Sequence, residues 1–232
     1  MRKRKFYFAV ALIAAMFTQT IMAQPATVRV RFSGKAPDIN DFVTSFARAY
    51  NGSEDFSTFS SEVVKGTHGY AYAEIVSDKR NGYASYKTES GIDGSVKKLE
   101  MCYWNCTGGK SKIVAVNVLS LYGGKTDRSV MTFYRYDNAT RVMKKIAAPF
   151  DRKVRPVDYT GPQRTRPSIR KKARSFGNRE ATGEWAPIYT LPQQGKNIEL
   201  RIANGSLLTL AERQWIRYNW TGNGFRLVVV ED

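Results

Sequence analysis

The sequence contains one histidine, His68, among 232 residues. This scarcity excludes a metal centre built on several imidazoles, and every catalytic triad with a histidine base would have to use His68. His68 follows Gly66-Thr67 in a segment typical of a turn, and no Gly-x-Ser-x-Gly nucleophile motif accompanies it. We therefore interpret His68 as a surface residue and predict no metal site and no cofactor.

Long apolar runs are equally scarce, and the clearest one lies at the start of the chain. It extends from Phe6 to Phe17, after the basic residues 2–5 and before a polar stretch that closes on Ala23. The run is shorter than the roughly 20 residues that span a bilayer, and together these features predict a secretory signal peptide cleaved between Ala23 and Gln24. We expect an exported protein that is periplasmic, cell-surface or secreted, with no transmembrane segment after signal removal.

Most of the remaining chain shows the alternation of apolar and polar residues that is typical of half-buried strands. Paired strand segments flank short polar turns and predict antiparallel hairpins at 70–76 with 83–87, 99–104 with 113–118, 130–136 with 141–146, 198–203 with 207–210, and 213–220 with 225–230. The predicted fold class is therefore α+β and β-rich, an antiparallel meander of hairpins.

One helix interrupts this pattern. Phe42, Val43, Phe46 and Tyr50 recur at helical spacing and would share one face. Asp38 is the expected N-cap, because a carboxylate accepts hydrogen bonds from the first free amides of a helix. We expect a single N-terminal helix packed on the sheet.

Composition changes after Phe150. Residues 152–179 contain ten Lys or Arg and one acid, Asp158, so the local charge is +9. Three prolines and few apolar residues predict a segment that does not bury enough surface to order itself. The predicted organisation is a signal peptide (1–23), a larger β-rich module with one helix (24–150), a basic flexible linker or loop (151–183) and a smaller β-hairpin module (184–232).

The basic segment is the functional candidate that has a physical mechanism. Clustered cations attract polyanions by releasing counterions, without a rigid site and without specific recognition of nucleic acid. Outside the cytoplasm, the expected partners are anionic polysaccharides, lipopolysaccharide or lipid head groups.

Ile169, Ala173 and Phe176 would additionally form an amphipathic turn that lies on a membrane surface. The alternative interpretation is a solvated linker whose charge aids solubility. The candidate polyanion-binding residues are Arg152, Lys153, Arg155, Arg164, Arg166, Arg170, Lys171, Lys172, Arg174 and Arg179.

The two cysteines, Cys102 and Cys106, are four residues apart, so in an extended strand their Cα atoms would be about 13 Å apart. A disulfide needs roughly 4.4–6.8 Å, which requires a turn or bulge between them. An oxidising compartment would permit the bond. We favour two unbridged thiols, with Cys102 in a sheet.

The chain also contains an internal similarity. The segment from Tyr103 to Gly108 matches Arg217 to Gly222 at an offset of 114 residues, with Asn, Thr and Gly identical. Convergence of aromatic strands on Asn/Gly turns and duplication of a hairpin both explain this match. The stretches 100–105, 114–117 and 133–136 resemble β-rich exported bacterial proteins of unknown function, and the likeness covers residues 70–146. It implies a β-rich fold and carries no activity.

The function that these observations favour is non-catalytic: an exported binding or structural protein of the envelope or surface, which contacts anionic polymers or lipid head groups through the basic segment. The alternative is an extracytoplasmic hydrolase based on carboxylates, which needs two acids about 5–9.5 Å apart across a cleft. Glu62, Glu74, Glu89 and Glu100 are candidate acids, and they follow no motif.

Overall fold

The computed structural model describes residues 24–50, 53–65, 73–90, 94–122, 125–160, 166–202 and 215–230. The predicted signal peptide, His68, Arg164 and the predicted strand 207–210 lie outside these residues. Gln24, on the far side of the predicted cleavage point, is the first residue described.

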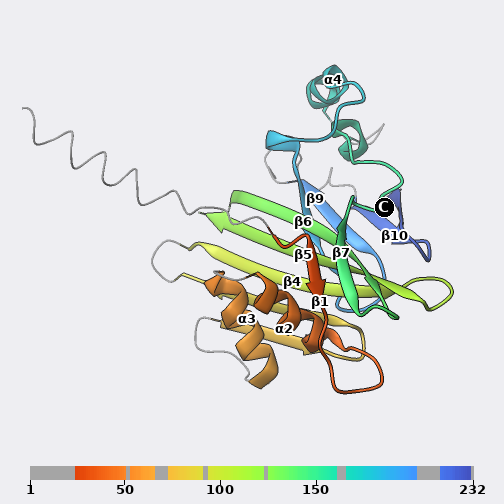
Figure 1. Ribbon diagram of the computed structural model, residues 1–232. Helices are drawn as coiled ribbons and strands as arrows, with labels where there is room; N and C mark the ends of the chain where they lie inside the picture. The colour runs from red at the N-terminus through yellow and green to blue at the C-terminus, as the bar shows by residue number, and fades with distance from the viewer. Residues whose placement is uncertain are drawn as a thin grey trace, which may run out of the picture.

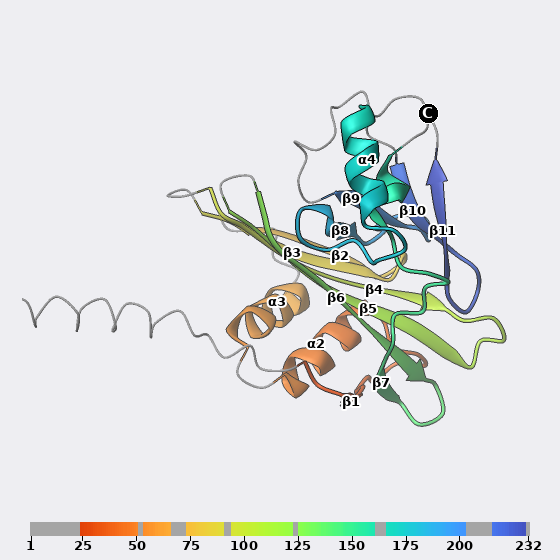
Figure 2. The same cartoon turned by 90° about the horizontal axis from the view of Figure 1, so that it is seen from above.

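The fold has three layers, with a large antiparallel sheet in the middle (Figure 1). This sheet has the order β1-β7-β6-β5-β4-β3-β2 and a second sheet has the order β11-β10-β9-β8. Figure 2 shows helices α2 and α3 on one side of the large sheet, and the small sheet with α4 on the other. The strands of the large sheet are β1 (Thr27–Arg29), β2 (Ala73–Asp78), β3 (Tyr83–Glu89), β4 (Val96–Asn105), β5 (Ser111–Tyr122), β6 (Lys125–Asp137) and β7 (Val142–Ile146), and those of the small sheet are β8 (Pro187–Thr190), β9 (Ile198–Ile202), β10 (Trp215–Trp220) and β11 (Phe225–Val230).

The β-rich α+β class is confirmed, and so are four predicted hairpins: β2–β3, β4–β5, β6–β7 and β10–β11 are antiparallel neighbours. The strands alternate as their sequence period predicts. In β4, Leu99 and Met101 face the helices, whereas Cys102 and Trp104 face the small sheet. Both faces of the large sheet are therefore covered, and each contributes to a separate hydrophobic core.

Helix α2 (Ile39–Ala49) confirms the predicted helix and its N-cap. The Asp38 carboxylate accepts from the amides of Asn40 at 2.8 Å and Asp41 at 3.2 Å. The Asp41 carboxylate in turn accepts from the amide of Asp38 at 2.9 Å, which completes a capping box. Phe42, Val43 and Phe46 are fully buried against the sheet, as the helical spacing predicts.

The expectation of a single N-terminal helix was wrong, because α3 (Glu54–Lys65) follows α2 and packs beside it on the same face of the sheet. Phe56, Phe59 and Val63 are its buried apolar residues, at intervals of three and four. The Phe56 ring lies 5.0 Å from that of Phe46 and 5.4 Å from that of Tyr50. Aromatic contacts between the two helices therefore extend the core that α2 begins.

The segment 151–183 also differs from its prediction as a flexible linker. It contains the 3₁₀ helix η1 (Pro156–Tyr159) and the helix α4 (Pro167–Ser175), and a second 3₁₀ helix, η2 (Gly183–Trp185), begins at its last residue. Val154, Tyr159 and Ala173 are at most 2% exposed and belong to the core between the sheets. A few apolar residues, spaced among the cations, are enough to hold the segment against the small sheet.

Candidate functional site

The first part of the basic segment is organised around Asp158, a buried carboxylate in η1. The Arg152 guanidinium donates to both of its oxygens, at 2.7 and 2.9 Å, and the Arg155 amide donates at 2.7 Å. Burial opposes ionisation of Asp158, but these donors outweigh it and hold the pKa of Asp158 below its ordinary value. The Arg155 guanidinium also lies 3.5 Å from Asp158 Oδ1, so Arg152 and Arg155 both serve the fold by neutralising a buried charge.

Two further candidates are engaged in ion pairs at the surface. Lys153 pairs with Glu180, and Lys172 pairs with Glu184. Each acid lies in the turn or short helix that follows α4, outside the range in which the sequence places the +9 charge. These two ion pairs therefore neutralise part of the positive charge of residues 152–179.

The predicted membrane-facing turn is also placed differently. Ala173 is completely buried, and Ile169 and Phe176 pack against the core between the sheets. The Phe176 ring meets that of Trp185 edge-on at a centroid distance of 6.1 Å. The amphipathic spacing is real, but its apolar face contacts the protein itself and is not available to a lipid surface.

The remaining cations lie on the outer side of this segment. Arg166, Lys171, Arg174 and Arg179 are exposed, and none of them has an ion pair with any residue that the structure describes. We call these four residues the α4 surface. Arg170 is half-buried, and Arg164 lies outside the described residues. Of the ten predicted residues, these four form the exposed and unpaired cationic set.

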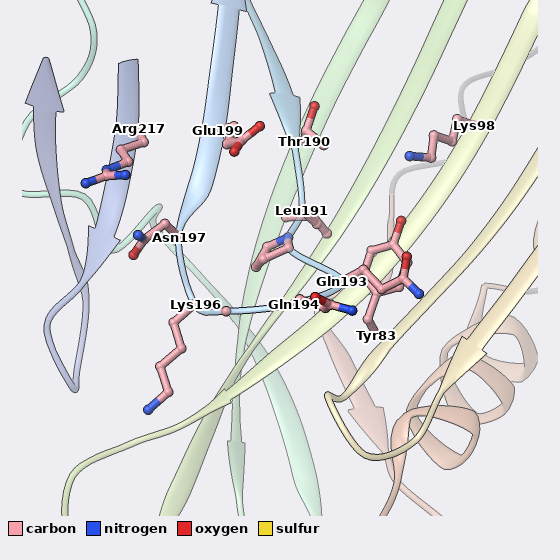
Figure 3. Close-up of a pocket in the computed structure, with 12 residues that line it drawn as sticks. Tyr83, Lys98, Thr190, Leu191, Gln193, Gln194, Lys196, Asn197, Glu199 and Arg217 are labelled. Carbon is pink, nitrogen blue, oxygen red and sulfur yellow. The ribbon is translucent and has the colours of Figure 1, made fainter. Parts of the chain in front are cut away.

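A cavity that the sequence did not indicate lies between the large sheet and the segment joining β8 to β9 (Figure 3). Its volume is about 390 Å³. The lining comes from β3, β4, β8, β9, β10 and the loop 191–197 and comprises Tyr83, Lys98, Thr190, Leu191, Pro192, Gln193, Gln194, Gly195, Lys196, Asn197, Glu199 and Arg217. Tyr83 and Lys98 precede Thr190, the first lining residue of the small sheet, by 107 and 92 positions, so only the tertiary fold brings the two parts of the lining together.

Beneath this cavity, Glu100 is a buried carboxylate with three donors. Its Oε1 accepts from the Tyr83 hydroxyl at 2.9 Å and from Lys98 Nζ at 2.8 Å, and its Oε2 accepts from Asn117 Nδ2 at 2.8 Å. The same Asn117 amide also donates to the carbonyl of Tyr189 in β8, at 3.0 Å. Glu100 therefore links β3, β4 and β5 and fixes two residues of the cavity lining, while its partner Asn117 connects the large sheet to the small one.

The ionisation of neighbouring groups reflects this buried charge. Burial raises the pKa of Tyr83 and the nearby Glu100 carboxylate raises it further. The same two causes, in the same order, raise the pKa of the Cys102 thiol. Both groups are thus neutral at physiological pH, and Cys102 is a packing residue with little thiolate character.

Both cysteines are free and buried in the structure. Cys102 lies in β4, and its sulfur approaches the carbonyl of Pro192 at 3.6 Å. Cys106 follows the end of the same strand. No group of three or more histidine, cysteine or acidic residues that could hold a metal ion occurs in the described part of the chain.

None of the four candidate acids of a hydrolase lines this cavity. Glu62 lies on α3 beside Lys65, and Glu74 and Glu89 both approach Lys87 at 3.9 Å. Glu100 is 1% exposed and lies beneath the cavity, whose lining contains one acid, Glu199. The pair of facing carboxylates that glycoside hydrolysis requires is therefore not assembled at this cavity.

Comparison of the chain with protein-family models, curated proteins and solved structures finds no match. Within the described residues, no helix has the length and apolar character needed to cross a bilayer.

Proposed function

We propose that the protein is an exported, non-catalytic binding protein of the cell envelope or surface, and that it contacts anionic polymers or lipid head groups through the α4 surface. The observation that carries this proposal is the set of four exposed cations that pair with no acid in the described part of the chain, Arg166, Lys171, Arg174 and Arg179. They lie on or beside one short helix that the core holds in place.

Electrostatics support this proposal. A polyanion gains affinity when cations on a protein release its condensed counterions, and the gain depends on the number of cations that reach it. The α4 helix contains no acidic residue that would compete for its cations. Because Ile169, Ala173 and Phe176 pack inward, the contact we propose is made by charge alone, without insertion of apolar side chains.

The test uses the mature chain that begins at Gln24. We expect it to bind heparin and vesicles that contain phosphatidylglycerol at low salt, and to bind uncharged phosphatidylcholine vesicles much more weakly. Replacing the α4 surface by Arg166→Gln, Lys171→Gln, Arg174→Gln and Arg179→Gln should weaken binding to heparin and reduce the slope of log affinity against log salt by about 3.

A matched control neutralises the same number of exposed cations elsewhere, by Lys35→Gln, Lys110→Gln, Lys144→Gln and Lys145→Gln. Both variants have the same net charge, so a general charge effect would weaken them equally. Equal binding by the two variants, or no binding by the wild-type protein, would overturn the proposal. Preference for vesicles over heparin, or the reverse, identifies which polyanion the surface prefers.

Export is the other part of the proposal, and the N-terminal sequence pattern supports it. Expression of the full chain in a bacterium with a secretory pathway should release a product whose first residue is Gln24. Mass spectrometry of the intact product measures this directly. A product that retains residues 1–23 in the cytoplasm would contradict export.

A further inference from the structure

A second cavity adjoins the first at residues 195–196 of the loop 191–197. Its volume is about 220 Å³, and Gly195 and Lys196 line both cavities. Its other lining residues are Arg80, Asn81, Tyr103, Trp104, Asn105 and Trp220. The two cavities share these two residues, and together they extend from the β8–β9 side of the molecule to the turn between β2 and β3 and the end of β4; we call the pair the groove.

The loop between the cavities is held at three points. Trp104 Nε1 donates to the carbonyl of Lys196 at 2.9 Å, and the Trp220 amide approaches Asn197 Oδ1 at 3.4 Å. The Cys102 sulfur approaches the Pro192 carbonyl at 3.6 Å. Strands from both sheets therefore fix the loop before any ligand arrives, and a preorganised loop lowers the ordering cost of binding.

The first cavity presents uncharged hydrogen-bonding groups, together with charged residues that are paired, face an opposite charge or point away. Gln193, Gln194, Asn197 and Thr190 supply amides and a hydroxyl, whereas the Tyr83 hydroxyl already donates to Glu100. Four charged residues also line it. Lys98 is paired with Glu100, and Glu199 and Arg217 carry opposite charges at paired positions of β9 and β10. Figure 3 shows the Lys196 amino group pointing away from the other labelled side chains. Side-chain amides donate and accept at once, which suits a ligand with many hydroxyl groups.

The second cavity adds aromatic surface to side-chain amides. The rings of Trp104 and Trp220 are stacked at a centroid distance of 6.0 Å, and Trp220 and Tyr103 are half-buried. Asn81 and Asn105 lie beside them. Aromatic rings give large contact area to the C–H faces of a ring-shaped ligand, while the neighbouring amides bind its hydroxyls.

We infer that this groove is a binding site for an uncharged, hydroxyl-rich carbohydrate chain. Sugar residues in the first cavity hydrogen-bond to Gln193 and Gln194, and residues in the second pack on the Trp220 side of the groove. The site is separate from the α4 surface and does not depend on it. It gives the protein a second, electrically neutral mode of attachment to a glycan.

The test measures binding of the mature protein to a panel of uncharged hexasaccharides of glucose, N-acetylglucosamine, mannose and xylose by isothermal titration calorimetry. We expect at least one to bind, with an affinity that is unchanged between about 50 and about 500 mM salt, since no charges pair. The double variant Gln193→Ala/Gln194→Ala should bind it about tenfold more weakly, because each lost hydrogen bond costs a few-fold. Asn105→Ala should weaken it several-fold at the other end of the groove.

Gln193, Gln194 and Asn105 are all exposed, so these variants should remain folded. Asn223→Ala is the matched control, because Asn223 is an exposed amide that lines neither cavity. The α4 surface variant should bind the hexasaccharide normally, which separates failure of one proposal from failure of the other. Absence of binding across the panel, binding that disappears at high salt, or equal binding by Gln193→Ala/Gln194→Ala and wild type would each overturn the inference.

Discussion

The amide of Thr107 donates a hydrogen bond of 2.9 Å to the carbonyl of Gly222, so the turn after β4 contacts the turn between β10 and β11. These are the turns of the two hairpins whose sequences match at an offset of 114 residues. The stacked pair Trp104 and Trp220 lies next to the same contact. The matching segments therefore meet in space and join the two sheets at one end, whichever origin their similarity has.

Replacing Gly222 should destabilise the protein, for two reasons. Its φ of 99° favours glycine, and a Cβ atom at this position would clash with Thr107 Oγ1. We expect Gly222→Ala to lower the free energy of unfolding by about 2–4 kcal/mol. Urea denaturation monitored by tryptophan fluorescence measures this change.

Gly108 provides the control for backbone strain. Its φ is 85°, but a Cβ there would meet no atom within 4 Å. Gly108→Ala should therefore cost about 1 kcal/mol, from conformation alone. Adding Thr107→Ala to Gly222→Ala should recover the steric part of the loss. Equal losses for Gly108→Ala and Gly222→Ala would contradict the proposed clash.

The hydrogen bonds of the buried Glu100 carboxylate should contribute to the stability of the fold. Glu100→Gln keeps the size of the side chain but introduces a donor where the structure has only acceptors, facing the donors of Tyr83, Lys98 and Asn117. We expect it to lower the free energy of unfolding by about 2–4 kcal/mol. Glu199→Gln, in the exposed lining of the cavity, should change it by less than about 0.5 kcal/mol. Similar effects of the two substitutions would show that the Glu100 contacts contribute little.

Several features of the fold follow directly from sequence, because they depend on local pattern. Alternating aromatic and β-branched residues predicted the β4–β5 and β10–β11 hairpins, and Asp38 predicted the start of α2. The sequence does not predict helix α3, because the residues between Phe56, Phe59 and Val63 are mostly Ser and Thr, which are poor helix formers. These few apolar residues are also compatible with a loop. The helix is stabilised by packing their common face against α2 and the large sheet, which is a tertiary contact.

The candidate sites depend on tertiary contacts that no local sequence pattern predicts. The ten basic residues were visible as a cluster, but the pairs with Glu180 and Glu184 arise from the path of the chain after α4. The contacts of Glu100 depend on register, which places Ser85, Glu100 and Asn117 in one row across β3, β4 and β5. The groove in turn needs the small sheet to cover that row, so no sequence motif marks it.

Asp158 predicts a dependence of stability on pH. Its pKa is lower in the folded protein than its ordinary value of 3.8, so its contribution to stability is present above that value and is lost as pH falls through the folded pKa. At neutral pH, Asp158→Asn should lower the free energy of unfolding by about 1–3 kcal/mol, since Arg152 and Arg155 lose their partner. The difference from wild type should shrink as pH falls below about 4.

Urea denaturation at a series of pH values from neutral to acidic measures this difference. Glu180→Gln is the control, because Glu180 and Lys153 are 47% and 67% exposed and such surface pairs contribute at most about 1 kcal/mol. A destabilisation by Asp158→Asn that stays constant down to acidic pH would contradict the role assigned to the carboxylate charge.

The cysteines make a prediction about chemical reactivity. Cys102 and Cys106 are 2% and 5% exposed, and burial and the Glu100 charge raise the pKa of the Cys102 thiol. Because the thiolate is the reactive form, the folded protein should react with Ellman's reagent far more slowly than a free thiol does. In denaturant without reductant, two thiols per chain should react at once. Rapid reaction in the folded state would contradict the burial, and failure to react in denaturant would reveal a disulfide between the two.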